Sequence, residues 1–216
     1  FDVDGVLIDS MALKGRAFVE VFRDTSYTED AVLEYHMSHG GVTRTQKIEQ
    51  LLENLYSCKP TRVDVDHRVK KYTEIIQTFM SSAPTFAGAA DELSKWSARC
   101  PLHAVSATPR RELQQVLEHK SLSRYFKSIQ GWPPEKASII QSLIRQHGYR
   151  AERCVLIGDS SEDFRASTQT GIGFVLVNLH GTQDALHLSQ SIRYLSELEN
   201  AIFAVLSSWR PETNSP

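Results

Sequence analysis

Two aspartates at the start of the chain have a spacing suited to acid–base chemistry. Asp2 and Asp4 flank Val3 and precede Gly5, at the end of a short extended segment. Side chains two positions apart in a strand point to the same side, and the glycine lets the chain turn. Two neighbouring carboxylates can divide the work, one attacking as a nucleophile while the other holds or gives a proton. Taken alone, this pair is more typical of two solvated acids in a strand-end turn.

Two further residues have the chemistry of phosphate ligands. Ser106 follows the apolar stretch 102–105 and precedes a predicted helix start, where a hydroxyl and free backbone N–H groups can hold a phosphoryl oxygen. Lys136 follows a predicted loop, Gly131-Trp132-Pro133-Pro134, at the start of another predicted helix and offers a point charge. Each residue taken alone is more typical of a turn or of a helix surface.

A last acidic group follows the apolar stretch 154–157 and Gly158. Asp159 and Asp163 are carboxylates that could complete a hard-cation site with Asp2. Purely structural roles also fit these residues: Asp159 could be a helix N-cap, and Asp163 an exposed acid in the first helical turn. In an open parallel sheet, ligands bind at the carboxyl ends of the strands, so residues distant in sequence converge there.

The elements that must position these residues alternate along the second half of the chain. Strands are predicted at 102–105, 126–129, 154–157 and 174–177, and helices from Thr108-Pro109 onward, over 135–147 and from 159 to about 170. Thr108 is expected as an N-cap and Pro109 as the first helical residue. Such alternation indicates right-handed crossovers and an α/β fold with a Rossmann-like parallel sheet.

The region between the first motif and the later strands contains no convincing strand. Helix-period stretches cover 13–22, 29–37, 43–55 and 63–80. We therefore expect an α/β core formed by residues 1–9 and 86–210, an inserted all-helical cap at 10–85, and a disordered tail at 211–216. The chain opens without Met on what reads like the end of a strand, which suggests a fragment.

Composition excludes several classes of protein. The 216 residues carry 24 Lys and Arg against 26 Asp and Glu, and this net charge of −2 gives no basic footprint for nucleic acid. No apolar run approaches the roughly 20 residues that span a bilayer. Three cysteines form neither a metal spacing nor an even disulfide set, so reduced thiols and a cytoplasmic location are expected.

Taken together, Asp2-Val3-Asp4-Gly5-Val6, Ser106, Lys136 and Gly158-Asp159 with Asp163 resemble the haloacid dehalogenase-like hydrolase superfamily, in the order in which that family carries them. The helical insertion resembles the cap of its phosphoglycolate phosphatase and β-phosphoglucomutase group. The resemblance covers nearly the whole chain.

The resemblance implies a role for each matching position. Asp2 would form an aspartyl-phosphate, and Asp4 would act as general acid and then as base. Mg²⁺ would be held by the Asp2 carboxylate, the Asp4 backbone carbonyl and Asp159. Ser106 and Lys136 would bind the phosphoryl group, and Asp163 would support the metal or Lys136. These roles describe an Mg²⁺-dependent phosphatase acting on a small phosphorylated metabolite, with no nucleic-acid or membrane partner.

Substrate choice is expected to depend on the cap. Arg44 and Lys47 lie three positions apart on one predicted helix face, next to Thr43, and could contact a second anionic or hydroxylated group of the substrate. A solvated helix face is the commoner explanation for such charges. The sequence gives no oligomeric state.

Several other functions are weighed against the phosphatase. A phosphosugar mutase would use the same residues, and a non-catalytic binding domain of a longer protein would need none of their chemistry. A dehalogenase is disfavoured, because Asp4 matches the phosphatase pattern of the family. A phosphonate-cleaving enzyme would need a Schiff-base lysine in the cap, and Lys14 and Lys47 are the lysines available there.

Overall fold

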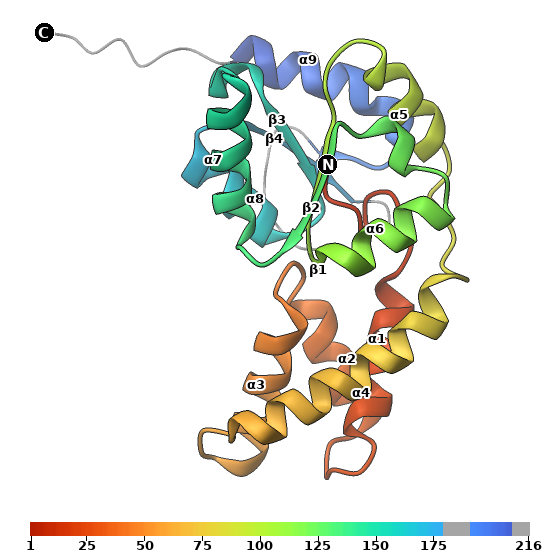
Figure 1. Ribbon diagram of the computed structural model, residues 1–216, viewed down its shortest axis with the longest axis vertical. Coiled ribbons are helices and arrows are strands. Elements are labelled where there is room, and N and C mark those ends of the chain that lie inside the picture. The colour runs from red at the N-terminus through yellow and green to blue at the C-terminus, as the bar shows by residue number, and fades with distance from the viewer. Residues whose placement is uncertain (179–190, 209–216) are drawn as a thin grey trace, which may run out of the picture.

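A parallel sheet flanked by helices forms one part of the molecule, and a layer of helices lies beyond one end of it (Figure 1). The structure is a computed structural model that describes residues 1–178 and 191–208. The strands are β1 (His103–Pro109), β2 (Ser128–Trp132), β3 (Val155–Gly158), β4 (Gly173–Val177) and β5 (Ser191–Ile192). β1 pairs in parallel with β2, and β3, β4 and β5 pair in parallel in that order. The predicted α/β class with a parallel sheet is confirmed.

The first residues of the chain connect these two groups of strands. The amino group of Phe1 donates to the carbonyl oxygen of His103 at 2.9 Å, and the N–H of Asp2 donates to the carbonyl oxygen of Ile157 at 2.8 Å. The segment from Phe1 to Val3 therefore runs between β1 and β3, in the place of a central strand. This position explains why the Val3 side chain is buried, and it puts Asp2 and Asp4 at the middle of the sheet edge.

Helices cover both faces of the sheet. They are α5 (Ala89–Ser97), α6 (Arg110–His119), α7 (Lys136–His147), α8 (Ser161–Thr170) and α9 (Leu198–Ser208), with short 3-10 turns at Ser123–Tyr125, Ala151–Arg153 and Leu195–Glu197. Apolar side chains of α7 and α8 form one cluster with Val105 and Leu156 of the sheet. The other cluster joins α5, α6 and α9 to the rest of the sheet and continues into the cap. β3 and β4 are apolar along their whole length, as strands covered on both sides usually are, whereas β1 and β2 also contain polar residues.

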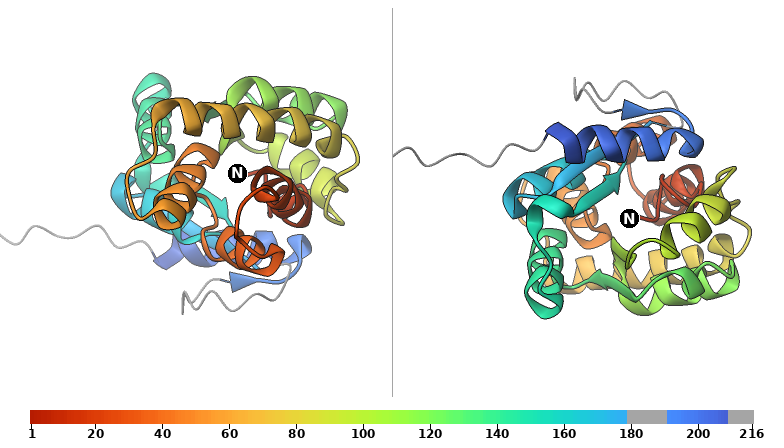
Figure 2. Two further views of the ribbon diagram at one scale, coloured as in Figure 1. Left: turned by 90° about the horizontal axis from the view of Figure 1, so that it is seen from below. Right: turned by 90° about the horizontal axis from the view of Figure 1, so that it is seen from above.

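The helical cap consists of α1 (Met11–Phe22), α2 (Glu29–Ser38), α3 (Arg44–Tyr56) and α4 (Arg62–Met80). Thr28, Thr43 and Thr61 cap the last three helices, because each hydroxyl accepts a backbone N–H from the first helical turn. Phe18, Tyr72 and their apolar neighbours form the interior of the layer. The views from below and above show this layer stacked on one end of the sheet (Figure 2). The prediction of an all-helical cap is confirmed, whereas the domain boundaries at 9/10 and 85/86 stay a prediction.

Some predicted elements are shifted. The strand expected at 126–129 is β2, which begins at Ser128 and includes Gly131 and Trp132, expected in a loop. β1 continues to Pro109, so Pro109 is the N-cap of α6 rather than its first residue, and Thr108 does not cap that helix. The tail at 211–216 and the end of the core at 209–210 lie outside the described residues. Within the described ranges, no helix has the length and apolar character that a membrane span requires.

A buried ion pair joins the cap to the core. Nη2 of Arg44 on α3 donates to both carboxylate oxygens of Glu112 on α6, at 2.7 and 2.8 Å, and Nη1 donates to Thr73 at 3.1 Å. The guanidinium also stacks over the Tyr72 ring, 4.8 Å from its centroid. Both side chains of the pair are 9% exposed. The expectation that Arg44 belongs to a solvated helix face is therefore wrong, because α3 turns this face towards α4 and α6.

We predict that Arg44→Met lowers the free energy of unfolding by about 3 kcal/mol, since it leaves the Glu112 carboxylate buried without a partner. Replacing both residues, in Arg44→Met/Glu112→Met, should recover most of that loss, as urea unfolding followed by circular dichroism would show. Arg23→Met is the matched control, because the Arg23–Glu20 pair is exposed and should contribute less than about 1 kcal/mol. A variant Arg44→Met as stable as the wild type would contradict a buried cap–core pair.

Candidate active site

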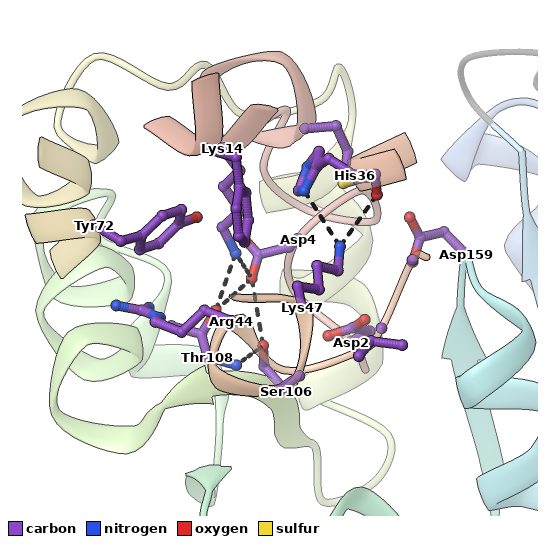
Figure 3. A pocket seen from close by; sticks show the side chains of 16 residues that line it. Asp2, Asp4, Lys14, His36, Arg44, Lys47, Tyr72, Ser106, Thr108 and Asp159 are labelled. Carbon is purple, nitrogen blue, oxygen red and sulfur yellow. Dashed lines mark hydrogen bonds and ion pairs between the residues drawn. The ribbon is translucent and has the colours of Figure 1, made fainter. Parts of the chain in front are cut away.

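The carboxyl ends of the central strands open into a cavity that the cap covers (Figure 3). Asp2 and Asp4 from the N-terminal segment, Ser106 from β1 and Asp159 after β3 line it on the core side. Lys14, His36 and Lys47 line it on the cap side, with Arg44 and Tyr72. The structure thus brings together in one cavity residues that are up to 157 positions apart, as expected for the switch point of a parallel sheet.

Asp2 is held from two sides. Its Oδ1 accepts the N–H of Val3 at 2.7 Å, and its Oδ2 lies 3.0 Å from Nζ of Lys136, which reaches it from the first turn of α7. The Asp2 residue is only 5% exposed. Burial raises the pKa of Asp2, and Lys136 offsets part of that rise. This carboxylate is therefore oriented, poorly solvated and adjacent to a fixed positive charge.

Lys136 is the centre of a small ion-pair network. It also pairs with Asp163, whose other oxygen accepts the Ser160 hydroxyl at 2.5 Å within a capping box at the start of α8. Burial would lower the pKa of Lys136, but the charges of Asp163 and Asp2 outweigh it and raise the pKa. Asp163 is completely buried, so the alternative of an exposed first-turn acid is wrong, and the N-cap is Ser160 rather than Asp159.

Asp4 faces a different set of partners. Its carboxylate lies 2.6 Å from Nζ of Lys14 and accepts hydroxyl groups of Ser10 at 2.6 Å, Thr108 at 2.9 Å and Ser106 at 3.3 Å. Burial would raise the pKa of Asp4, yet Lys14 and these hydrogen bonds lower it to about 2. The environments of the two aspartates therefore push their pKa values in opposite directions, a pattern typical of acid–base sites.

The Asp159 carboxylate packs against the turn that follows Asp4. A Cβ atom at Gly5 would lie 1.9 Å from Oδ2 of Asp159, and Gly5 has φ of 79°, so only glycine fits here. Carboxylate oxygens of Asp2, Asp159 and Asp163 all lie within 4.8 Å of one another. Burial raises the pKa of Asp159 well above its usual range, and the charges of Asp2 and Asp163 raise it further.

This acidic cluster fits a divalent cation. Three carboxylates face a single lysine, Lys136, which leaves an excess of two negative charges in a site with little water. Oxygen ligands of this kind suit a hard cation such as Mg²⁺. The predicted ligands Asp2 and Asp159 belong to the cluster, together with Asp163. The Asp4 carboxylate does not, since it faces Lys14, so only the Asp4 backbone carbonyl is left for the metal contact that the sequence suggested for this residue.

The predicted specificity residues have different surroundings. Thr43 caps α3 and exchanges hydrogen bonds with Gln46, and the Arg44 guanidinium is paired with Glu112. Lys47 is 4% exposed and lines the cavity, so it too does not belong to a solvated helix face. Of the two cations, Lys47 is the one that forms no ion pair with a carboxylate of the described residues.

Sequence reasoning missed several residues of the cavity. Lys14 and Thr108 hold Asp4, and His36 holds Lys47. Thr108 had a usable signal, because it lies two positions after Ser106 in a strand and therefore on the same side. His36 and Lys14 had none, since their approach to the core depends on how the cap packs.

Comparison with known proteins agrees with this geometry. The family model of haloacid dehalogenase-like hydrolases matches residues 1–177. The chain belongs to the haloacid dehalogenase-like hydrolase family. The family and its phosphatase members confirm the prediction that this protein is a hydrolase.

Relatives of this hydrolase cover most of its length. A 6-phosphogluconate phosphatase from Escherichia coli K12 is 25% identical over 179 residues, which cover 80% of this chain and 76% of the relative. A predicted phosphoglycolate phosphatase from Haemophilus somnus shares the fold with a TM-score of 0.76 and 15% identity, over 93% of this chain and 95% of the other. A protein from Thermotoga maritima assigned as a β-phosphoglucomutase gives a TM-score of 0.70 and 23% identity, over 95% and 97%. The fold is that of the capped group predicted from the motifs.

We predict that Asp159→Asn raises the melting temperature in EDTA, because it removes a carboxylate that is penalised by burial and by two like charges. The sign follows from the raised pKa of Asp159: at neutral pH, ionisation costs more in the folded state than in the unfolded chain. The same variant should lose most of the increase that Mg²⁺ gives the wild type, which is about 5 to 10 °C at a hundredfold excess over Kd.

Differential scanning fluorimetry with and without Mg²⁺ measures both effects. Glu162→Gln is the matched control, because the Glu162 carboxylate pairs with Arg165 on the same helix and lies outside the cluster. If Asp159→Asn keeps the full Mg²⁺ increment, the cation binds elsewhere.

Proposed function

We propose that this hydrolase cleaves a small phosphomonoester with the help of Mg²⁺, through an aspartyl-phosphate on Asp2. The observation that supports this most strongly is the pair of opposed carboxylates, Asp2 beside Lys136 and Asp4 beside Lys14, in one covered cavity. A phosphoryl group and a carboxylate repel each other, so attack requires cations placed in advance. Lys136 is one of them.

Asp2 is proposed as the nucleophile. The Val3 N–H and Lys136 fix the plane of its carboxylate, so that an oxygen can be aligned with phosphorus. Asp2, Asp159 and the Asp4 backbone carbonyl would hold Mg²⁺, with Asp163 beside them. When bound, Mg²⁺ supplies charge neutralisation for the carboxylate and the phosphoryl oxygens.

Asp4 is proposed as the proton carrier. It gives a proton to the oxygen of the departing alcohol, then takes one from the water that attacks the aspartyl-phosphate. With Lys14 as its main partner, Asp4 has a pKa of about 2 and is therefore ionised at neutral pH, the state that the base of the second step requires. The arrival of a phosphoryl dianion disfavours a second negative charge nearby, and so favours the protonated Asp4 that the first step requires.

Ser106 and Lys136 are proposed to hold the transferring phosphoryl group. The Ser106 hydroxyl is buried and accepts the N–H of Thr108 at 3.1 Å, which orients it at the end of β1. The helices that follow, α6 and α7, have no side-chain cap at their N-termini, so their first N–H groups are available to an anion. The substrate would be a small phosphorylated molecule, and a cytoplasmic location remains our expectation.

We predict that Asp2→Asn lowers kcat for phosphate release by more than about 10⁴-fold while the protein stays folded, since the amide is a poor nucleophile. The measurement is inorganic phosphate release from a panel of sugar phosphates, phosphoglycolate and nucleotides, with circular dichroism as the check on folding. Asp30→Asn, on the exposed surface of α2 and absent from the residues lining the cavity, serves as the control and should keep wild-type turnover.

Unchanged phosphate release by Asp2→Asn would refute the nucleophile. If the wild type instead returns the phosphoryl group to a sugar, with no net phosphate release, the protein is a phosphosugar mutase that uses the same residues. If neither reaction occurs with any member of the panel while Mg²⁺ still binds, the protein is better explained as a non-catalytic binding domain.

A further inference from the structure

A lysine and a histidine of the cap form a buried pair that the phosphoryl chemistry does not use. Nζ of Lys47 on α3 lies 3.1 Å from the carbonyl oxygen of His36 and 3.2 Å from its Nδ1. Lys47 is 4% exposed and His36 is 3% exposed, and both line the cavity with the aspartates (Figure 3). Phe18 packs beside them, with its ring centroid 5.7 Å from Nζ of Lys47 and 5.0 Å from the imidazole.

Each of the other cations around the cavity has a carboxylate partner. Lys14 is paired with Asp4, Arg44 with Glu112, and Lys136 with Asp2 and Asp163. No carboxylate of residues 1–178 or 191–208 forms an ion pair with Lys47. Burial lowers the pKa of Lys47 to about 7, and the charge of Asp159 offsets only part of that fall. Its ammonium form thus stands in the cavity wall without an ion-pair partner, an arrangement that costs free energy unless a ligand supplies the missing charge.

His36 orients the ammonium group of Lys47. Burial, and then the charge of Lys47, lower the pKa of His36 to about 3, so the imidazole is neutral. Because Nδ1 faces the ammonium group, the ring proton is assigned to Nε2. Nε2 is buried without a hydrogen-bond partner in the described part of the chain, although the backbone of Met11 is near enough to favour its protonation. Two of the three ammonium hydrogens face His36, which leaves one for a ligand.

We propose that Lys47 binds a carboxylate on the leaving-group part of the substrate, so that the substrates are small phosphomonoesters of hydroxy acids. This inference rests on the proposed phosphatase function and deepens it by naming the substrate class. Lys47 is the one cavity cation of the described chain that a substrate could pair with without displacing a protein carboxylate.

Two features favour a carboxylate over other groups. A hydroxyl would leave the buried charge of Lys47 uncompensated, whereas a carboxylate neutralises it. A second phosphate would bring two charges and more oxygen atoms than one ammonium group with a single free hydrogen can satisfy.

Matched pairs of esters test this directly. The first pair is 2-phosphoglycolate and 2-hydroxyethyl phosphate, and the second is 6-phosphogluconate and glucitol 6-phosphate; in each pair a carboxylate is replaced by a hydroxymethyl group. We expect the wild-type enzyme to favour the acid of at least one pair by about tenfold or more in kcat/KM. In Lys47→Met, kcat/KM for that acid should fall by about 10- to 100-fold, mainly through KM, while the alcohol changes less than about threefold.

Two controls accompany the variant. Lys70→Met removes a lysine from the exposed surface of α4 and should leave both esters unaffected. Calorimetric binding of each ester to Asp2→Asn, in the presence of Mg²⁺, reports the preference without turnover, so a poorly folding Lys47→Met would not decide the matter. Lys47→Gln is the second variant and should lose the same preference.

The outcomes separate this inference from the function beneath it. The carboxylate site is refuted if the wild type releases phosphate from both members of each pair at equal kcat/KM. It is also refuted if Lys47→Met loses as much activity on the alcohol as on the acid. In both cases the proposed phosphatase function is unaffected. Absence of phosphate release from every ester, including p-nitrophenyl phosphate, overturns the phosphatase and the inference together.

Discussion

Mutual repulsion of buried carboxylates is the constraint that organises this protein. Asp2, Asp4, Asp159 and Asp163 all meet at one edge of the sheet, where little water can solvate them. Lys14 compensates Asp4, and Lys136 is shared by Asp2 and Asp163. One positive charge cannot neutralise three carboxylates, and the negative charge that remains is the reason that a divalent cation fits between them. Burial, reinforced by the neighbouring carboxylates, raises the pKa of Asp2 and Asp159, whereas Lys14 and hydrogen bonds lower that of Asp4.

The backbone makes this crowding possible. The segment from Phe1 to Val3 is hydrogen-bonded to both β1 and β3, so Asp2 cannot move away from its neighbours. Gly5 turns the chain at φ of 79° and leaves room for the Asp159 carboxylate. On the cap side, Gly41 comes so close to the start of α8 that a Cβ atom would lie 2.6 Å from Oγ of Ser160. Gly41 thereby brings the cap into direct contact with the core beside the cavity.

Much of the core arrangement could be predicted because it depends on local patterns. Apolar runs mark the strands, and polar residues at their carboxyl ends converge in a parallel sheet whatever the details of packing. The helices of the cap could be predicted for the same reason, since Thr28, Thr43 and Thr61 are local capping signals. The strand ends could not, because β1 is extended to Pro109 by pairing with Trp132, a residue that the pattern placed in a loop.

The features that could not be predicted from the sequence depend on contacts between the helices of the cap and between the cap and the core. Arg44 and Lys47 have the spacing of an exposed helix face, and no local signal shows that α3 turns this face inward against α4, α6 and His36. Once it does, their roles differ: Arg44 meets Glu112 of the core, and Lys47 meets no carboxylate of the described chain. The cap therefore supplies the cations Lys14 and Arg44 to carboxylates of the core, and these ion pairs stabilise the contact between the two layers. Lys47 forms no such ion pair within the described residues, so it is the cap cation in the cavity wall that a charged group of a ligand can neutralise.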